Sequence, residues 1–136
     1  MPEETLLAFD FGTRKIGVAL GNTLTGQARP LRILMSTTRA QRFAQVGALL
    51  EEWRPDRVIV GLPLTLDGGE QPASRLSRRF ANQLQGRFGV TVELVDERGS
   101  SLEAQQLLGT HADDDAMAAC VILQRYLDAR AHAAQV

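Results

Sequence analysis

The chain has 136 residues, of which 44% are hydrophobic and 23% charged, and its net charge at pH 7 is −1. This composition is that of an ordinary globular protein of one-domain length, so we expect a single domain over residues 1–136 and no disordered chain. The longest apolar runs, such as Ala116–Leu123, are too short to cross a bilayer, and no signal-peptide pattern precedes the first expected strand. We therefore expect a cytoplasmic protein with no membrane partner.

The first part of the chain is predicted to form three strands. Leu6–Phe9 is a short apolar run that ends at Asp10, and Ile16–Leu20 is a second run. The connection between them is short enough to favour an antiparallel hairpin. A third strand is expected over Leu31–Met35, after a turn region that contains Gly26 and Pro30.

The hydrophobic period then changes from that of a strand to that of a helix. Apolar residues recur every three or four positions at Phe43, Val46, Leu50 and Trp53. Pro55 ends this helix. Val58–Val60, within Arg57–Gly61, is a continuous apolar run typical of a buried central strand, and a loop is expected over Leu62–Gly69.

The remaining elements alternate in the same way. A second helix is marked by Leu76, Phe80, Leu84 and Phe88. Gly89 is placed to end that helix, and Val90–Val95 is the fifth expected strand. A short helix is expected over Leu102–Leu108 and a last one over about Asp114–Ala131. The order predicts an α/β fold with a five-stranded mixed sheet, an antiparallel meander followed by parallel strands, and helices on both faces.

Three acidic residues stand where such a sheet collects its functional groups. Asp10 ends the first strand, Glu97 follows the fifth, and Asp115 opens the last helix. The first and fifth strands can be neighbours, so we expect the three carboxylates to converge. Taken singly, each acid has a structural alternative, as a turn former or a helix cap, and Asp113 or Asp114 can also cap the last helix.

A cluster of three carboxylates requires a cation, because like charges held close together repel one another. Mg²⁺, or Mn²⁺ in its place, prefers such oxygen ligands and leaves coordination positions for water and phosphate. Two such ions about 3.5–4 Å apart are suited to displacement at a phosphodiester, with water as the nucleophile. The acids therefore indicate a metal-dependent nuclease.

Basic residues lie beside two of these acids. The segment Gly12, Thr13, Arg14 and Lys15 follows Asp10, and Arg98 follows Glu97. These five residues are the candidate nucleic-acid contacts. The alternative for each charged one is a salt-bridged surface position.

Arginine dominates the basic residues of the chain, with 14 Arg and one Lys. Arg75, Arg78 and Arg79 fall within five residues. Arginine suits phosphate recognition, because its planar fork can bond two oxygens at once. A general bias toward Arg at solvent-facing positions explains the cluster equally well.

Four segments, in order along nearly the whole chain, resemble the motifs of one bacterial family. Residues 10–19 (DFGTRKIGVA) resemble the opening motif of the YqgF family, also called RuvX. Residues 61–64 (GLPL) with 67–68 (DG) resemble its central loop, and 96–98 (DER) its third motif. Residues 115–119 (DAMAA), followed by 122–124 (ILQ), resemble its last-helix motif.

The resemblance implies an RNase H-like fold with Asp10, Glu97 and Asp115 as its catalytic, metal-binding acids. It also implies a nuclease of ribosome biogenesis that matures the 5′ end of pre-16S rRNA. An older view assigns Holliday junction cleavage in branched DNA. A non-catalytic RNA- or ribosome-binding module is a further alternative, and Asp10–Thr13 also resembles a phosphate loop of actin-like ATPases. We expect a monomer or a weak homodimer.

Two segments depart from the family pattern. Gly99–Ser101 replaces the usual Leu-Thr-Thr after the third motif, and the stretch from Leu107 to Asp115 is short and acidic where relatives often carry a longer basic loop. If that loop normally holds nucleic acid, binding in this chain is expected to be weaker or to use another surface.

Overall fold

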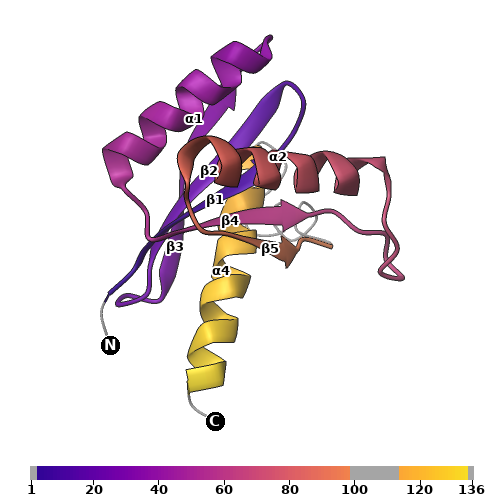
Figure 1. Cartoon of the computed structure of the whole chain (residues 1–136). Helices are drawn as coiled ribbons and strands as arrows, with labels where there is room; N and C mark the ends of the chain where they lie inside the picture. Colours follow the sequence, from indigo (N-terminus) through magenta and orange to yellow (C-terminus); the bar gives the residue numbers. More distant parts are fainter. Residues whose placement is uncertain (1–2, 99–113, 135–136) are drawn as a thin grey trace.

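A computed structural model of the chain describes residues 3–98 and 114–134. These residues form one five-stranded sheet with helices on both faces (Figure 1). The elements in chain order are β1 (Thr5–Phe11), β2 (Lys15–Asn22), β3 (Gln27–Met35), α1 (Arg39–Trp53), β4 (Arg57–Leu62), α2 (Pro72–Phe88), β5 (Val92–Asp96) and α4 (Asp114–Ala134). The expected meander, parallel strands and flanking helices are confirmed; the helix expected over 102–108 lies outside the described residues.

The order of strands across the sheet is β3-β2-β1-β4-β5, with β4 parallel to both β1 and β5. The expectation that the first and fifth strands can be neighbours is therefore wrong, because β4 lies between them. Its residues Val58, Ile59 and Val60 are all fully buried, so both faces and both edges of this strand must be covered. The more exposed β5 takes the edge.

Strand β3 begins earlier than the sequence pattern indicates. It starts at Gln27 and includes Pro30, which pairs with Ala19 of β2 next to a shift in register. Proline has no N–H to donate to the ladder, so a sheet accepts it at an edge strand or an irregularity, and β3 provides both. Pro30 therefore lies in the strand, outside the turn.

Local signals at the ends of α1 and α2 explain where each helix begins and ends. The Thr38 side chain accepts a hydrogen bond from the Gln41 backbone N–H at 3.1 Å, and the Gln41 side chain reaches back to complete a capping box. Helix α2 begins at Pro72 and ends before Gly89, whose φ of 67° suits a residue without a side chain.

The alternation of side chains along β1 divides the core between the two faces of the sheet. Leu7 and Phe9 point toward α1 and α2, whereas Leu6 and Ala8 point toward α4. The same alternation places Asp10 on the α4 face. The sequence of β1 therefore decides on which side of the sheet the first candidate acid lies.

Helix α4 runs antiparallel to β1 across the far face of the sheet, behind the strands in Figure 1. Its C-terminal part is held near the start of β1, where Arg130 pairs with Glu4. Further toward its N-terminus, Ile122 lies against Gly61 near the end of β4. The first turn of α4 is thus directed to the carboxyl ends of the parallel strands. None of the described helices is long and apolar enough to span a membrane.

Replacing Phe80 with Ala is expected to destabilise the fold by about 3–5 kcal/mol, because the cavity would remove aromatic contacts from three neighbours. The Phe80 ring centroid lies 5.8 Å from that of Phe9, 4.7 Å from Phe11 and 6.2 Å from Phe43. Urea unfolding measures the change. Leu66, which is 89% exposed, is the control, and Leu66→Ala should change stability by less than about 0.5 kcal/mol. Similar losses for both variants would contradict this account of the core.

Candidate functional site

Asp10 and Glu97 meet on the α4 face at the carboxyl end of the sheet. Asp10 is the penultimate residue of β1, and Glu97 directly follows β5. The backbone N–H of Glu97 donates to the carbonyl of Leu62 at 3.1 Å, so the pairing of β5 with β4 continues as far as the acid. The two carboxyl groups hydrogen-bond to each other.

The residue that permits this contact is Gly61 on the intervening strand. A Cβ atom at position 61 would lie 2.7 Å from Oε2 of Glu97 and 2.5 Å from Cδ1 of Ile122. Both distances are shorter than real contacts of a Cβ atom. The Glu97 side chain therefore occupies the space above Gly61, and the missing side chain lets two acids on non-adjacent strands interact.

Glu97 is half-buried, and its environment favours the neutral carboxyl group. Burial raises the pKa of Glu97 from 4.5 to about 9, and the charge of Asp10 and the hydrogen bond to it act in the same direction. The guanidinium of Arg125, whose Nη1 donates to the Asp96 carbonyl at 3.3 Å, acts in the opposite direction. Without a cation, the pair retains a proton at neutral pH.

Asp115 is the third predicted acid, and the structure places its backbone in the first turn of α4. Its side chain lies outside the described residues. The direction of α4 brings this turn toward the end of the sheet that carries Asp10 and Glu97. Among the described side chains, no third carboxylate, histidine or cysteine joins the pair to complete a metal-binding cluster.

The predicted nucleic-acid contacts from Gly12 to Lys15 form the β1–β2 turn at the same end of the sheet. A Cβ atom at Gly12 would lie 2.5 Å from the Lys15 carbonyl oxygen, so the turn has no room for a side chain there. The Thr13 carbonyl accepts from Nη2 of Arg42 at 3.2 Å, which ties the turn to α1. The side chains of Thr13, Arg14 and Lys15 are exposed.

Arg98, the other predicted contact, is bound within the protein. Its Nε and Nη2 atoms lie 2.7 Å from Oδ2 of Asp96, and Nη1 donates to the Leu66 carbonyl at 3.1 Å. This pairing lowers the pKa of Asp96. In the structure Arg98 ties the end of β5 to the loop after β4, and its contact with nucleic acid stays a prediction.

Two residues that shape the site were not among the predicted ones. Gly61 sits inside a buried apolar strand, and a glycine in that position signals the close approach of another group. Arg125 lies three residues after Ile122, which places both side chains on the same side of a helix. The first signal was available in the sequence; the second required knowledge of which face of α4 is buried.

Replacing Gly61 with Ala is expected to cost about 1–3 kcal/mol of stability, because the new methyl group overlaps Glu97 and Ile122. Gly86→Ala is the matched control, since Gly86 lies within α2 and has open space around it. The control should gain about 0.5–1 kcal/mol from helix propensity. Chemical denaturation compares the two, and a neutral or stabilising Gly61→Ala would refute the packing described above.

The stability of the metal-free protein is expected to fall as the pH rises from about 5 to 9. The pKa of Glu97 is about 9 in the folded protein and 4.5 in a free side chain, so the fold binds a proton that the unfolded chain releases. This contribution is complete below pH 4.5 and is lost as the pH passes through 9. Thermal melts in EDTA should show a pH dependence that is weaker in Glu97→Gln. Parallel curves for the two proteins would disprove the shift.

Comparison with known proteins identifies the family and the fold. The sequence profile of the RuvX family, described as Holliday junction resolvase, matches residues 4–129. A Bordetella parapertussis protein named "Putative pre-16S rRNA nuclease" is 77% identical over 128 residues, covering 94% of this chain and 96% of its own. A protein of the same name from Paraburkholderia phymatum is 52% identical over 130 residues, covering 93% and 86%.

Solved structures agree on the architecture. Thermus thermophilus RuvC bound to a Holliday junction has a TM-score of 0.61 at 17% identity, covering 93% of this chain and 95% of its own. Fowlpox virus resolvase with junction DNA has a TM-score of 0.60 at 13% identity, covering 93% and 98%. The expected RNase H-like fold is confirmed, and the chain belongs to the RuvX family.

Proposed function

We propose that this protein is a nuclease that hydrolyses phosphodiester bonds with the help of a divalent cation. The observation that carries the proposal is the hydrogen-bonded pair of Asp10 and Glu97, held across Gly61 at the carboxyl end of the sheet. Ligands of α/β proteins usually bind at the carboxyl ends of the strands, which is where this pair lies. Membership of the RuvX family supports the same class of reaction.

The donor set fits Mg²⁺ or Mn²⁺. Two carboxyl groups within hydrogen-bonding distance strongly resist being ionised together, and the raised pKa of Glu97 reports this cost. A hard cation bound by carboxylate oxygens would replace the shared proton and allow both groups to ionise. When bound, one or two such ions supply positive charge against the phosphate oxygens and activate water as the nucleophile.

The side chains of this chain would then have distinct tasks. Asp10 and Glu97 would hold the cation, and Asp115, in the first turn of α4, is the proposed third ligand. Arg125 lowers the pKa of Glu97, so it favours the ionised form that binds metal. Gly12, Thr13, Arg14 and Lys15 are the proposed contacts to the strand on either side of the bond that is cut, together with Arg98.

We propose the 5′ end of pre-16S rRNA as the substrate, and the cytoplasm as the place of action. The relative that is 77% identical bears the name of such an enzyme, and so does the one at 52%. Branched DNA is the second candidate, because the description of the family names the Holliday junction. Both substrates present the same phosphodiester to the carboxyl pair.

Replacing Asp10 with Asn is expected to reduce the cleavage rate at least about 100-fold. Mutating a residue that only hydrogen-bonds to a metal ligand typically lowers activity about 10–100-fold, and Asp10 is a proposed ligand itself. Purified protein is incubated with end-labelled pre-16S leader RNA, and separately with a four-way DNA junction, in Mg²⁺, in Mn²⁺ and in EDTA. Asp128→Asn, on an exposed part of α4, is the control and should retain full activity.

The same variant makes a second readout possible. Asn at position 10 removes a like charge from Glu97, so Asp10→Asn should melt at the same or a higher temperature than the wild type in EDTA. Lost cleavage in a fully folded variant would then be a property of the site. Undiminished cleavage by Asp10→Asn would refute the proposed function. If the wild type and the variants all bind RNA and none cleaves it, the result would favour a non-catalytic module.

A further inference from the structure

A groove lined by arginines lies between α1 and α2, on the face of the sheet opposite to α4. Its walls include Phe11 and Thr13 from β1 and the turn after it, Arg39 and Arg42 from α1, and Arg79 from α2. It encloses about 250 Å³. We call it the α1–α2 groove. The carboxyl pair does not lie in it.

The charged side chains that line the α1–α2 groove in the described part of the chain are all basic. Helix α2 contains no Asp or Glu, and the acids of α1, Glu51 and Glu52, are at its far end. Within the part of the chain that the structure describes, no carboxylate lies within ion-pair distance of Arg39, Arg42 or Arg79. A concave surface with uncompensated arginines attracts anions.

Arg42 is held in place at the wall of the groove. Its Nη2 donates to the Thr13 carbonyl at 3.2 Å, and its guanidinium carbon lies 5.0 Å from the centroid of the Phe11 ring. Its Nε atom is buried and has no hydrogen-bond partner among the residues that the structure describes. These contacts fix the Arg42 guanidinium at the wall of the groove, so its positive charge is already in place for an anion that enters.

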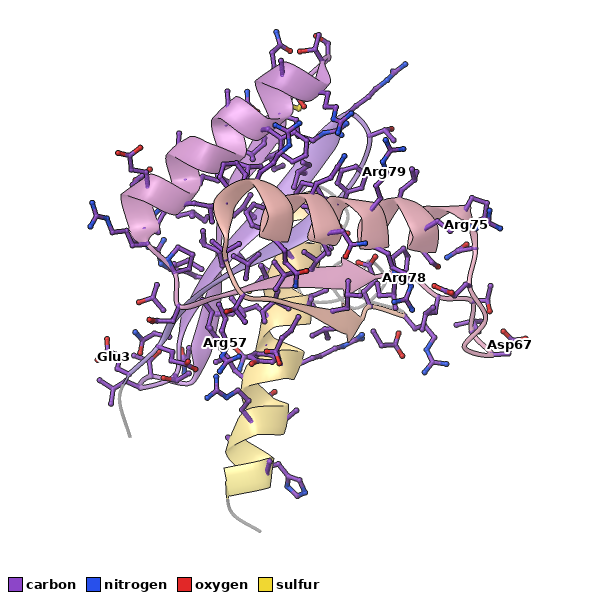
Figure 2. The ribbon with its side chains drawn as sticks, viewed as in Figure 1. Glu3, Arg57, Asp67, Arg75, Arg78 and Arg79 are labelled. Carbon is purple, nitrogen blue, oxygen red and sulfur yellow. The ribbon has the colours of Figure 1, made fainter. Side chains whose placement is uncertain are left out.

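The arginines of α2 differ in how they are used. Arg78 donates to Glu70 at 2.6 Å, which neutralises its charge on the loop side of the helix. Arg79 lies on the side of α2 toward α1, and Arg75 lies near the start of the helix (Figure 2). Of the cluster seen in the sequence, Arg78 therefore serves an internal ion pair and Arg79 lines the groove.

The α1–α2 groove and the carboxyl pair are adjacent along the chain but lie on opposite faces of the sheet. Phe11 directly follows Asp10, and alternation along β1 sends their side chains to opposite sides. The turn from Gly12 to Lys15 connects the two faces. A small phosphate ligand could reach only one of them, whereas a polymer passing over this turn would contact both.

We infer that the α1–α2 groove binds the phosphate backbone of the nucleic-acid substrate, at a stretch of the strand away from the bond that is cut. The inference rests on the proposed function for the identity of the polymer, and on the uncompensated arginines Arg39, Arg42 and Arg79 for its location. It gives the chain a basic binding surface although its net charge is −1 and its segment 107–115 is acidic.

The test measures the affinity of a fluorescently labelled 20-nucleotide RNA in EDTA, where cleavage plays no part. Arg39→Ala combined with Arg79→Ala should weaken binding about tenfold and lower the slope of log K against log salt by about 1.4, or about 0.7 for each lost phosphate contact. Arg29→Ala combined with Arg32→Ala removes the same charge from the exposed edge strand β3 and should change the affinity less than twofold.

The Lys versions, Arg39→Lys with Arg79→Lys, keep the charge and should retain most of the affinity; circular dichroism confirms that all variants are folded. Equal losses in the two alanine pairs, or a wild type that binds no RNA, would overturn the inference. The result is separable from the proposed function: loss of binding in the Arg39 and Arg79 pair with no cleavage by the wild type would leave the groove standing and the nuclease refuted. Cleavage that depends on Asp10, together with unchanged RNA binding in the Arg39→Ala and Arg79→Ala variant, would support the nuclease and refute the groove.

Discussion

The contact between two carboxyl groups, Asp10 and Glu97, is the constraint on which this end of the molecule depends. Two like charges this close would be costly in a half-buried place, and the pair avoids that cost by keeping a proton on Glu97, whose pKa is raised to about 9. The strand between them contributes a glycine, Gly61, and Ile122 of α4 closes the space on the other side. The packing of an apolar helix and the position of an ionisable pair are thus set by the same few atoms.

The far end of the sheet supports the site by fixing the course of α4. Arg130 pairs with Glu4 just before β1, and the Tyr126 hydroxyl donates to Glu93 at the start of β5. Both contacts lie in the C-terminal half of α4 and hold that half over the starts of β1 and β5, while the apolar residues before them pack on the sheet. The direction is what brings the first turn of α4, and with it Asp115, to the end where Asp10 lies.

Periodicity and turn residues predicted the type and order of every strand and helix in the described part of the chain, because burial imposes a two-residue or a 3.6-residue repeat. These local patterns could not predict that β4 separates β1 from β5, because strand order depends on tertiary packing. The pair of Asp10 and Glu97 was predicted from strand ends, yet the reason it forms, Gly61, was not. Arg125 escaped prediction because its partner, the carbonyl of Asp96, carries no signal in the sequence.

Net charge conceals how the charges are arranged. Arginines such as Arg57, Arg98 and Arg130 are paired with carboxylates and hold elements of the fold together. Arg39 and Arg79 have no such partner among the described residues and share one groove. A chain with 15 basic and 16 acidic residues is nearly neutral however they are arranged, so one of its surfaces can still be strongly basic. The sum of −1 therefore says little about affinity for a polyanion. The affinity depends on where the charges lie, and here one turn of the chain separates an acidic site from a basic groove.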